Sequence, residues 1–269
     1  MRPTDILAEY RGFLVDVDGV LVRGQQPIPG AQEAFRDLRD RAKTVALTNS
    51  SSRSCEVLAD HLTSLGFPVE PENVVTTSRI AAEYLARLAG FVTFWVLGED
   101  GLRIELERAG HRPAASPEEA DWVVAGIDRA ISYETLAAAL RALRSGARLL
   151  GTNSDPTFPG ADGLLPGAGS ILGALEGMGF TPEETVGKPS PIAFETALHR
   201  FDAEPASTLM IGDRLETDIV GATEAGLPSA LVLTGVTSSE TAASSEIRPT
   251  WIATSLAALV RGEATRTAS

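Results

Sequence analysis

The sequence has few residues of the types that form covalent or soft-metal sites: one cysteine, Cys55, and three histidines among 269 residues. A single cysteine cannot form a disulfide within the chain, and it lacks companions for a thiolate metal site. We expect Cys55 to be a passive, half-buried thiol. The histidines lack the spacing of metal ligands, so surface or packing roles are expected for them.

Long apolar stretches and an excess of basic residues are also missing. No apolar run reaches the roughly 20 residues of a membrane-spanning helix, and the N-terminus lacks the basic-then-apolar layout of a signal peptide. We therefore expect a cytoplasmic protein. The 36 acidic and 23 basic residues give a formal charge of −13, which repels nucleic acid and anionic membranes. A phosphorylated ligand would need a local cluster of cations to overcome this charge.

Two familiar phosphate-binding motifs are absent as well. The Walker pattern would need a glycine where Pro182 stands, five positions before Gly187. The dinucleotide fingerprint is broken at Leu172 in the run GAGSIL. Nucleotide-driven and hydride-transfer chemistry are therefore disfavoured.

Short runs rich in Val, Ile and Leu alternate with longer amphipathic stretches, which predicts an α/β fold around parallel sheets. The pattern indicates two α/β units, one inserted into the other. For the outer unit we expect strands at 12–16, 44–48, 73–77, 207–213 and 229–235, with helices near 30–40, 54–65, 78–89, 191–201 and 215–225. For the inserted unit we expect strands at 91–98, 121–127 and 147–153, with helices near 100–109, 133–145 and 169–178.

Chemically capable side chains follow several strands of the outer unit. Asp16 ends the first strand and Asp18 lies two residues beyond it, Thr48 ends the second strand, and Asp213 ends the strand at 207–213. Ligands bind beyond the carboxyl ends of the strands in open parallel sheets. We therefore expect these groups to converge on one crevice.

The pair Asp16 and Asp18 has two interpretations. Alternation along an extended chain would point both carboxylates to the same side, where a cation or a retained proton would be needed to relieve their repulsion. Alternatively, the residues before Gly19 simply form a turn, since Asp-Gly is a common turn signal.

A second acidic pair, Asp213 and Asp218, lies in the run MIGDRLETDI. Mg²⁺ prefers oxygen ligands and keeps several waters, so two or three carboxylates are enough to bind it. Asp213, directly after Gly212, is well placed to be a metal ligand. Asp218, expected in the first turn of a helix, would either hold metal-bound waters or cap backbone N–H groups.

Two further segments could bind an anion. Thr48, Asn49, Ser50 and Ser51 place hydroxyl, amide and backbone N–H donors at an expected helix start, where phosphate binds well, although an ordinary N-cap would use part of the same run. Lys188, next to prolines in VGKPSP, would offer a compact charge for phosphate oxygens. Taken alone, Lys188 is better interpreted as a solvated surface lysine.

The runs DVDGV, TNSS, GKPSP and GDRLETD occur in the order of the four motifs of the haloacid dehalogenase superfamily of phosphatases, which the chain resembles over its whole outer unit. The resemblance implies that Asp16 is the nucleophile and Asp18 the general acid and base. It implies a Mg²⁺ ion held by Asp16, Asp213 and the backbone carbonyl of Asp18, with Asp218 beside them. Thr48, Asn49, Ser50 and Lys188 would bind the phosphate.

The resemblance also implies a Rossmann-like parallel-sheet core over 1–80 and 183–269, with an inserted α/β cap domain over 81–182. A large α/β cap between the second and third motifs is typical of the subfamily of nitrophenyl phosphatases and glycerol-3-phosphate phosphatases, and GLLPG, GKP and GDRLETDI resemble the actinobacterial glycerol-3-phosphate enzymes. The loop 151–171 is similar to the cap loop of that subfamily, with Asn153 and Asp155 as substrate-binding residues. Phe158 stands where pyridoxal phosphate phosphatases have a histidine, which argues against that substrate.

The resemblance therefore implies hydrolysis of a small organic phosphate monoester through an aspartyl-phosphate intermediate, with glycerol 3-phosphate or a sugar or polyol phosphate favoured. A nucleotide or aryl phosphate is the alternative substrate, and a phosphomutase or a catalytically silent binding protein are the alternative activities. A homodimer through the cap is common in the subfamily, and an exposed cap strand could form it, although no heptad or apolar patch demands one.

Overall fold

The computed structural model describes residues 6–160 and 163–267, which form two compact units. Among the described residues, unit 1 comprises 6–48, 59–75 and 188–267, and unit 2 comprises 49–58, 76–160 and 163–187. Two residues of the loop expected over 151–171, 161 and 162, lie outside the described residues, as do residues 1–5 of the N-terminal segment. Within the described ranges, no helix combines the length and the apolar character needed to cross a membrane.

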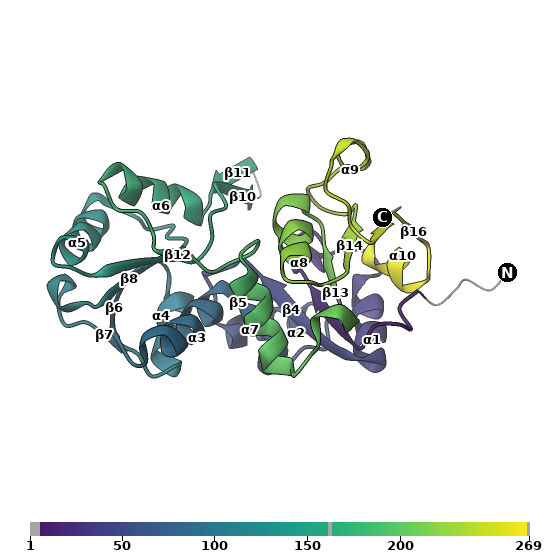
Figure 1. The fold of residues 1–269 in the computed structure, drawn as a ribbon, viewed down its shortest axis with the longest axis horizontal. Helices are drawn as coiled ribbons and strands as arrows, with labels where there is room; N and C mark the ends of the chain where they lie inside the picture. Colours follow the sequence, from purple (N-terminus) through teal and green to yellow (C-terminus); the bar gives the residue numbers. More distant parts are fainter. Residues whose placement is uncertain (1–5, 161–162, 268–269) are drawn as a thin grey trace. The chain divides into compact units, whose positions relative to one another are not determined.

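Unit 1 is built on a seven-stranded sheet (Figure 1). The ladders that join β1 to β13 and β4, β13 to β14, and β14 to β15 are all parallel, and the pair of β15 with β16 is antiparallel. In sheet order the strands are β16 (Ala264–Arg266), β15 (Trp251–Ala253), β14 (Ser229–Val232), β13 (Thr208–Gly212), β1 (Gly12–Val15), β4 (Lys43–Thr48) and β5 (Val74–Thr76).

The central strands are apolar because helices cover the sheet. Every residue of β1 and β13 is buried, as expected for parallel strands covered on both faces. Helix α1 buries Ala31, Ala34, Phe35 and Leu38, which share one face at helical spacing. The helices of this unit are α1 (Ala31–Arg41), α2 (Cys55–Ser64), whose first turn belongs to unit 2, α7 (Pro191–Phe201), α8 (Val220–Glu224), α9 (Ser239–Ser244) and α10 (Leu256–Val260).

Unit 2 contains a five-stranded, all-parallel sheet. In sheet order the strands are β12 (Glu184–Thr185), β9 (Arg148–Gly151), β8 (Trp122–Ala125), β6 (Thr93–Leu97) and β7 (Arg112–Pro113). Its helices are α3 (Thr77–Ala89), α4 (Asp100–Arg108), α5 (Tyr133–Arg144) and α6 (Ala168–Gly177). A separate hydrophobic core, which includes Leu97, Val123, Leu143 and Leu175, supports this unit.

All eight strands expected from the sequence are present, and the parallel sheets confirm the α/β fold class. The segment expected as one helix over 215–225 consists of a π-helical turn, η4 (Leu215–Ile219), followed by α8. The sequence did not predict two hairpins, β2 (Val22–Arg23) with β3 (Gln26–Pro27) and β10 (Thr157–Gly160) with β11 (Gly163–Pro166), nor the 3₁₀ turns η1 (Pro71–Asn73), η2 (Pro117–Glu119) and η3 (Pro205–Ser207).

Cys55 differs from its expected half-buried position, because its side chain is fully buried. Burial, followed by the nearby charge of Glu105, raises the pKa of its thiol to about 11. The thiol therefore stays protonated at neutral pH, which agrees with a passive role.

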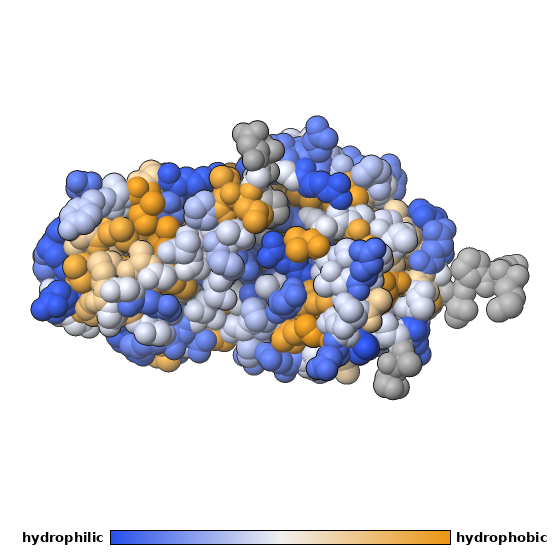
Figure 2. All heavy atoms as spheres, turned by 90° about the horizontal axis from the view of Figure 1, so that it is seen from above, coloured by the Kyte–Doolittle hydropathy of each residue, from blue (hydrophilic) through white to orange (hydrophobic). Residues whose placement is uncertain are grey.

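The visible face of the molecule carries mostly hydrophilic and intermediate residues, with hydrophobic residues gathered in separate patches (Figure 2). The large hydrophobic side chains that are exposed include Phe91 and Tyr133 in unit 2 and Val236 in unit 1.

Candidate active site

Asp16 and Asp213 are brought together by the register of two neighbouring strands of unit 1. Asp16 follows β1, Asp213 follows β13, and the parallel ladder pairs Val15 with Ile211. The amide of Asp16 continues that ladder with a 2.8 Å hydrogen bond to the carbonyl of Ile211. The two carboxylates therefore leave the same edge of the sheet, as the sequence predicts.

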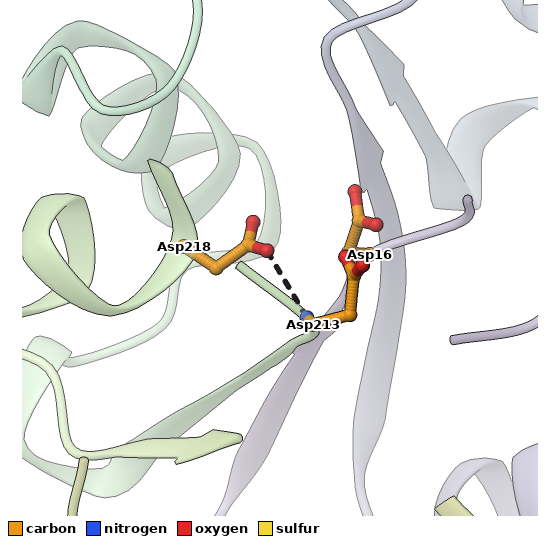
Figure 3. A group of neighbouring side chains, drawn as sticks. All are labelled: Asp16, Asp213 and Asp218. Carbon is orange, nitrogen blue, oxygen red and sulfur yellow. Dashed lines mark hydrogen bonds between the residues drawn. The ribbon is translucent and has the colours of Figure 1, made fainter. Parts of the chain in front are cut away.

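Asp218 completes a cluster of three buried carboxylates. Oxygen atoms of Asp16, Asp213 and Asp218 lie within 4.8 Å of one another, and Figure 3 shows the three side chains around a common space. Oδ2 of Asp218 accepts hydrogen bonds from the backbone amides of Asp213 (3.2 Å) and Arg214 (3.1 Å). The π-helical turn thus folds the Asp218 carboxylate back over the end of β13.

Glycine is required at the residue before Asp213, because a Cβ at Gly212 would lie 2.3 Å from the side chain of Asp218. The side chain of Asp218 can approach β13 only because this space is empty.

Lys188 joins the cluster from the segment that precedes α7. Its Nζ lies 2.6 Å from Oδ1 of Asp16 and 2.7 Å from Oδ1 of Asp218, and it also donates to the carbonyl of Leu47 at 3.3 Å. The side chain is 3% exposed, so the interpretation as a solvated surface lysine is wrong. Helix α7 begins directly afterwards, where the Ser190 side chain caps the amide of Ile192.

The charges of the cluster are unbalanced. Burial, reinforced by the nearby carboxylates, raises the pKa of Asp16 well above its ordinary value despite the opposing effect of Lys188. Burial, together with the charge of Asp218, raises the pKa of Asp213 to about 6. Burial disfavours the charged form of Lys188, but the attraction of Asp16 and Asp218 outweighs it and raises the pKa of the lysine. Lys188 therefore stays charged, while one ammonium faces three carboxylates.

This donor set fits a hard divalent cation. Three carboxylates with oxygen atoms this close together repel one another strongly unless a positive charge is added, and Mg²⁺ binds such oxygen ligands while keeping several waters. Asp16, Asp213 and Asp218 are thus the residues of unit 1 whose side chains could hold a metal or surround one.

The loop at 234–236, which the sequence did not indicate as part of the site, lies against Asp213. The amide of Val236 donates to Oδ2 of Asp213 at 2.6 Å, and a Cβ at Gly235 would lie 1.9 Å from that same oxygen. The hydroxyl of Thr234 donates to the carbonyl of Gly19 at 2.6 Å, which ties this loop to the one that carries Asp18. The signal that could have revealed the loop is the Thr-Gly pair that follows β14 at the same edge of the sheet.

Asp18 lies three residues beyond the end of β1, and Thr48 is the last residue of the neighbouring strand β4. Asp18 is exposed, and its charge contributes to the raised pKa of Asp16. The following Gly19 has a φ of +89°, which favours glycine, and its amide donates to the carbonyl of Val22 at 2.8 Å. Thr48 is buried at the end of β4, the strand beside β1.

Four of the expected substrate-binding residues belong to unit 2: Asn49, Ser50, Asn153 and Asp155. The side-chain nitrogen Nδ2 of Asn49 donates to Oδ2 of Asp155 at 3.0 Å. Nδ2 of Asn153 donates to the backbone carbonyl of Asn49 at 2.8 Å. The hydroxyl of Ser50 lies 3.2 Å from that of Ser52. Within this unit the structure therefore brings Asn49, Asn153 and Asp155 together across about a hundred residues of sequence.

Phe158, the residue that argues against pyridoxal phosphate, lies on β10 and is half-buried.

Two family models match the chain. The model described as haloacid dehalogenase-like hydrolase matches residues 13–112, and the model described as HAD-hydrolase-like matches residues 166–259. Among similar sequences, the 5'-nucleotidase YutF of Bacillus subtilis is 39% identical over 86% of this chain and 90% of its own length. The D-glycerol 3-phosphate phosphatase of Mycobacterium tuberculosis is 40% identical over 94% of this chain and 72% of its own length.

Solved structures agree with these matches. The glycerol phosphate phosphatase of M. tuberculosis in complex with magnesium has a TM-score of 0.87 at 40% identity, with 94% of this chain and 77% of that chain covered. The p-nitrophenyl phosphatase of Archaeoglobus fulgidus has a TM-score of 0.88 at 33% identity, with 93% of this chain and 98% of that chain covered. Together with the buried Asp16, Asp213 and Asp218 cluster, these similarities show that the chain belongs to the haloacid dehalogenase-like hydrolases.

Proposed function

We propose that this protein is a Mg²⁺-dependent phosphatase that hydrolyses a small organic phosphate monoester through an aspartyl phosphate on Asp16. The observation that carries the proposal is the buried cluster of three carboxylates around the ammonium of Lys188. Unit 1 is then the catalytic core, and the inserted residues, 81–182 in the sequence-based division, are the cap domain.

The metal would be held by the carboxylates of Asp16 and Asp213 and by the backbone carbonyl of Asp18. Bound there, Mg²⁺ would supply positive charge that keeps Asp16 ionised and draws the phosphate toward it. Asp218 supports this arrangement from beside the site, because it holds both Lys188 and the backbone amide of Asp213.

In the first step, an oxygen of the Asp16 carboxylate attacks the phosphorus, and the bond from phosphorus to the ester oxygen breaks. Lys188 orients Asp16 through the hydrogen bond to Oδ1. Asp18, an exposed acid two residues along the chain from Asp16, donates its proton to the departing alkoxide. Carboxylates are established covalent nucleophiles in this type of chemistry.

In the second step, Asp18 accepts a proton from a water molecule as that water attacks the phosphorus, and the bond from phosphorus to Asp16 breaks. Inorganic phosphate leaves, and Asp16 and Asp18 return to their starting states. Phosphoryl transfer requires mainly positioning and stabilisation of oxygen charge. The phosphoryl oxygens would be positioned, and their charge stabilised, by Thr48, Asn49, Ser50 and Lys188.

For the substrate, we favour glycerol 3-phosphate or another sugar or polyol phosphate. A similar sequence named D-glycerol 3-phosphate phosphatase supports this choice, since it matches 94% of this chain. A relative named 5'-nucleotidase and a structural neighbour named p-nitrophenyl phosphatase support nucleotide or aryl phosphates as the alternative. A homodimer through the cap remains a separate prediction.

Phosphate release tests the proposal. The purified protein is incubated with glycerol 3-phosphate, sugar phosphates, nucleoside monophosphates, pyridoxal phosphate and nitrophenyl phosphate, each with Mg²⁺ and with a chelator. We expect Mg²⁺-dependent release with glycerol 3-phosphate or a sugar phosphate as the best substrate. Release from none of these compounds would overturn the proposal in favour of a silent binding protein or, if isomeric phosphates form, a phosphomutase.

A further inference from the structure

The chain enters and leaves unit 2 at points that are hydrogen-bonded to one short segment of that unit, Thr152–Asn153. The side-chain nitrogen Nδ2 of Asn153 donates to the backbone carbonyl of Asn49, the first residue of the unit, at 2.8 Å. The amide of Gly187, the last residue of the unit, donates to the carbonyl of Thr152 at 2.7 Å. Two ends of the inserted unit that are far apart in sequence are thus fixed to adjacent residues.

The chain enters unit 2 a second time at Thr76, and the adjacent Thr77 belongs to the same network. The hydroxyl of Thr77 donates to the carbonyl of Asn49 at 2.9 Å, so this carbonyl accepts from both Thr77 and Asn153. The amide of Thr77 donates to the carbonyl of Ser50 at 3.2 Å. Each of these hydrogen bonds lies inside unit 2.

The network is buried and tightly packed. Asn153 is 2% exposed, and Thr152 and Thr77 are fully buried. A Cβ at Gly187 would lie 2.5 Å from the carbonyl oxygen of Thr152, 2.7 Å from Thr77 and 2.9 Å from Asn153. A backbone held this closely by buried hydrogen bonds has little freedom to shift.

The fixed residues are chain neighbours of residues that touch the phosphoryl group in the proposed mechanism. Asn49 follows Thr48 directly, and Gly187 precedes Lys188 directly. We propose that Asn153 is a positioning residue that holds the peptide units next to Thr48 and Lys188, rather than a residue that binds the organic part of the substrate. This inference rests on the proposed phosphatase function.

Both ends of the Asn153 carboxamide are engaged in this network. Its nitrogen donates to Asn49, and its Oδ1 accepts from the amide of Asp155 at 3.1 Å. The carboxylate of Asp155 in turn accepts from the side chain of Asn49 at 3.0 Å. Asp155 therefore orients Asn49, and its negative charge makes it ill-suited to contact a phosphate ester directly.

Two variants test the role of Asn153. In Asn153→Asp the side chain keeps its shape and its acceptor for Asp155, but it cannot donate to the carbonyl of Asn49 at neutral pH. In Asn153→Ala both hydrogen bonds are lost without a new charge. Leu143→Ala, in the hydrophobic core of the same unit, is the control for general destabilisation of that unit.

The measurement is kcat/KM for glycerol 3-phosphate, a sugar phosphate and nitrophenyl phosphate, which share only the phosphoryl group. The kcat/KM of both Asn153 variants should fall about 10- to 100-fold, since small misplacements of positioning groups have effects of this size. The loss should be the same factor for every substrate, and inhibition by inorganic phosphate should weaken with it. Leu143→Ala should lose less activity at an equal decrease in Tm. Losses that differ strongly between substrates would instead assign Asn153 to binding of the organic part.

Hydrogen exchange provides a readout that does not depend on catalysis. The amides of Gly187 and Thr77 should exchange faster in Asn153→Ala than in the parent protein or in Leu143→Ala. Unchanged exchange at both amides would overturn the positioning role even if activity fell. If the parent protein released no phosphate, the proposed function would fail, whereas the exchange result would still decide whether Asn153 anchors these peptides.

Discussion

The ammonium nitrogen of Lys188 lies 2.6 Å from Oδ1 of Asp16, and both side chains are buried in unit 1. A buried ion pair is costly to break, because removal of one partner leaves the other charge without compensation. Without Lys188, the carboxylates of Asp16 and Asp218 would lose the ammonium that balances part of their negative charge.

We therefore expect Lys188→Met to lower the free energy of unfolding by about 3 to 5 kcal/mol at pH 8 in the presence of a chelator. The decrease should be smaller at pH 5, because Asp16, whose pKa is already raised by burial and by its neighbouring carboxylates, can then become protonated. Denaturant unfolding monitored by circular dichroism would measure both values. The matched control is Lys43→Met, which changes the only other lysine, an exposed one on β4.

Asp18 is expected to affect the rate of catalysis rather than the stability of the protein. Replacement by Asn removes the proton donor and should lower kcat by about 10²- to 10⁴-fold, the usual contribution of general acid-base catalysis. Asp16→Asn should abolish turnover, since it removes the nucleophile. Steady-state kinetics on the best substrate would show both effects, with Asp37→Asn on the exposed face of α1 as the control. Normal turnover in pure Asp16→Asn would rule out the assigned nucleophile.

Gly235 is expected to strengthen metal binding although it has no side chain. A Cβ at this position would lie 1.9 Å from Oδ2 of Asp213, so Gly235→Ala must displace that carboxylate. The affinity for Mg²⁺ should fall about 10- to 100-fold, as is typical when the support of a metal ligand is lost. The increase of Tm with Mg²⁺ concentration measures this affinity. Gly173→Ala in α6, where a Cβ would contact nothing within 4 Å, should leave the affinity unchanged.

The pH dependence of stability should reveal the raised pKa of Asp213. Burial, together with the charge of Asp218, raises this pKa to about 6 in the folded protein, above its ordinary value of 3.8. A carboxyl whose pKa is raised by folding stabilises the folded protein. This contribution to the free energy of unfolding is fully present at pH values below the unfolded-state pKa and is lost as the pH rises through the folded-state pKa. In a chelator, the stability of the parent protein relative to Asp213→Asn should fall by about 2 to 3 kcal/mol between pH 4 and pH 7.

Urea unfolding at several pH values would measure this difference. A difference that did not change with pH would show that Asp213 titrates at its ordinary value in the folded protein.

The pairing of Asp16 with Asp213 could be predicted from the sequence, because each residue ends an apolar run and parallel strands end at the same edge. The direct contact of Asp218 with Lys188 could not, since it depends on a π-helical turn and joins residues 30 positions apart. The hydrogen bond between Asn49 and Asp155 spans 106 positions and follows no local pattern.

The hairpin of β10 and β11 shows a different limit of sequence reasoning. Leu164 and Leu165 on β11 are 72% and 42% exposed, so this strand shows neither the alternation nor the continuous burial by which strands are recognised. The loop at Thr234–Gly235 was missed for another reason: the part of Gly235 is to leave room for Asp213, and only the position of the Thr-Gly pair after β14 points to it.

The order of strands in unit 1 has a consequence for how the chain acquires its structure during translation. Strand β1 pairs with β4, which follows soon after it, but its other partner, β13, begins only at Thr208. By the time the ribosome has released that residue, all of the strands in the five-stranded sheet of unit 2 have already been made. Unit 2 can therefore fold while the sheet of unit 1 still lacks one side, and Asp16 meets Asp213 only after the strands of unit 2 have been made.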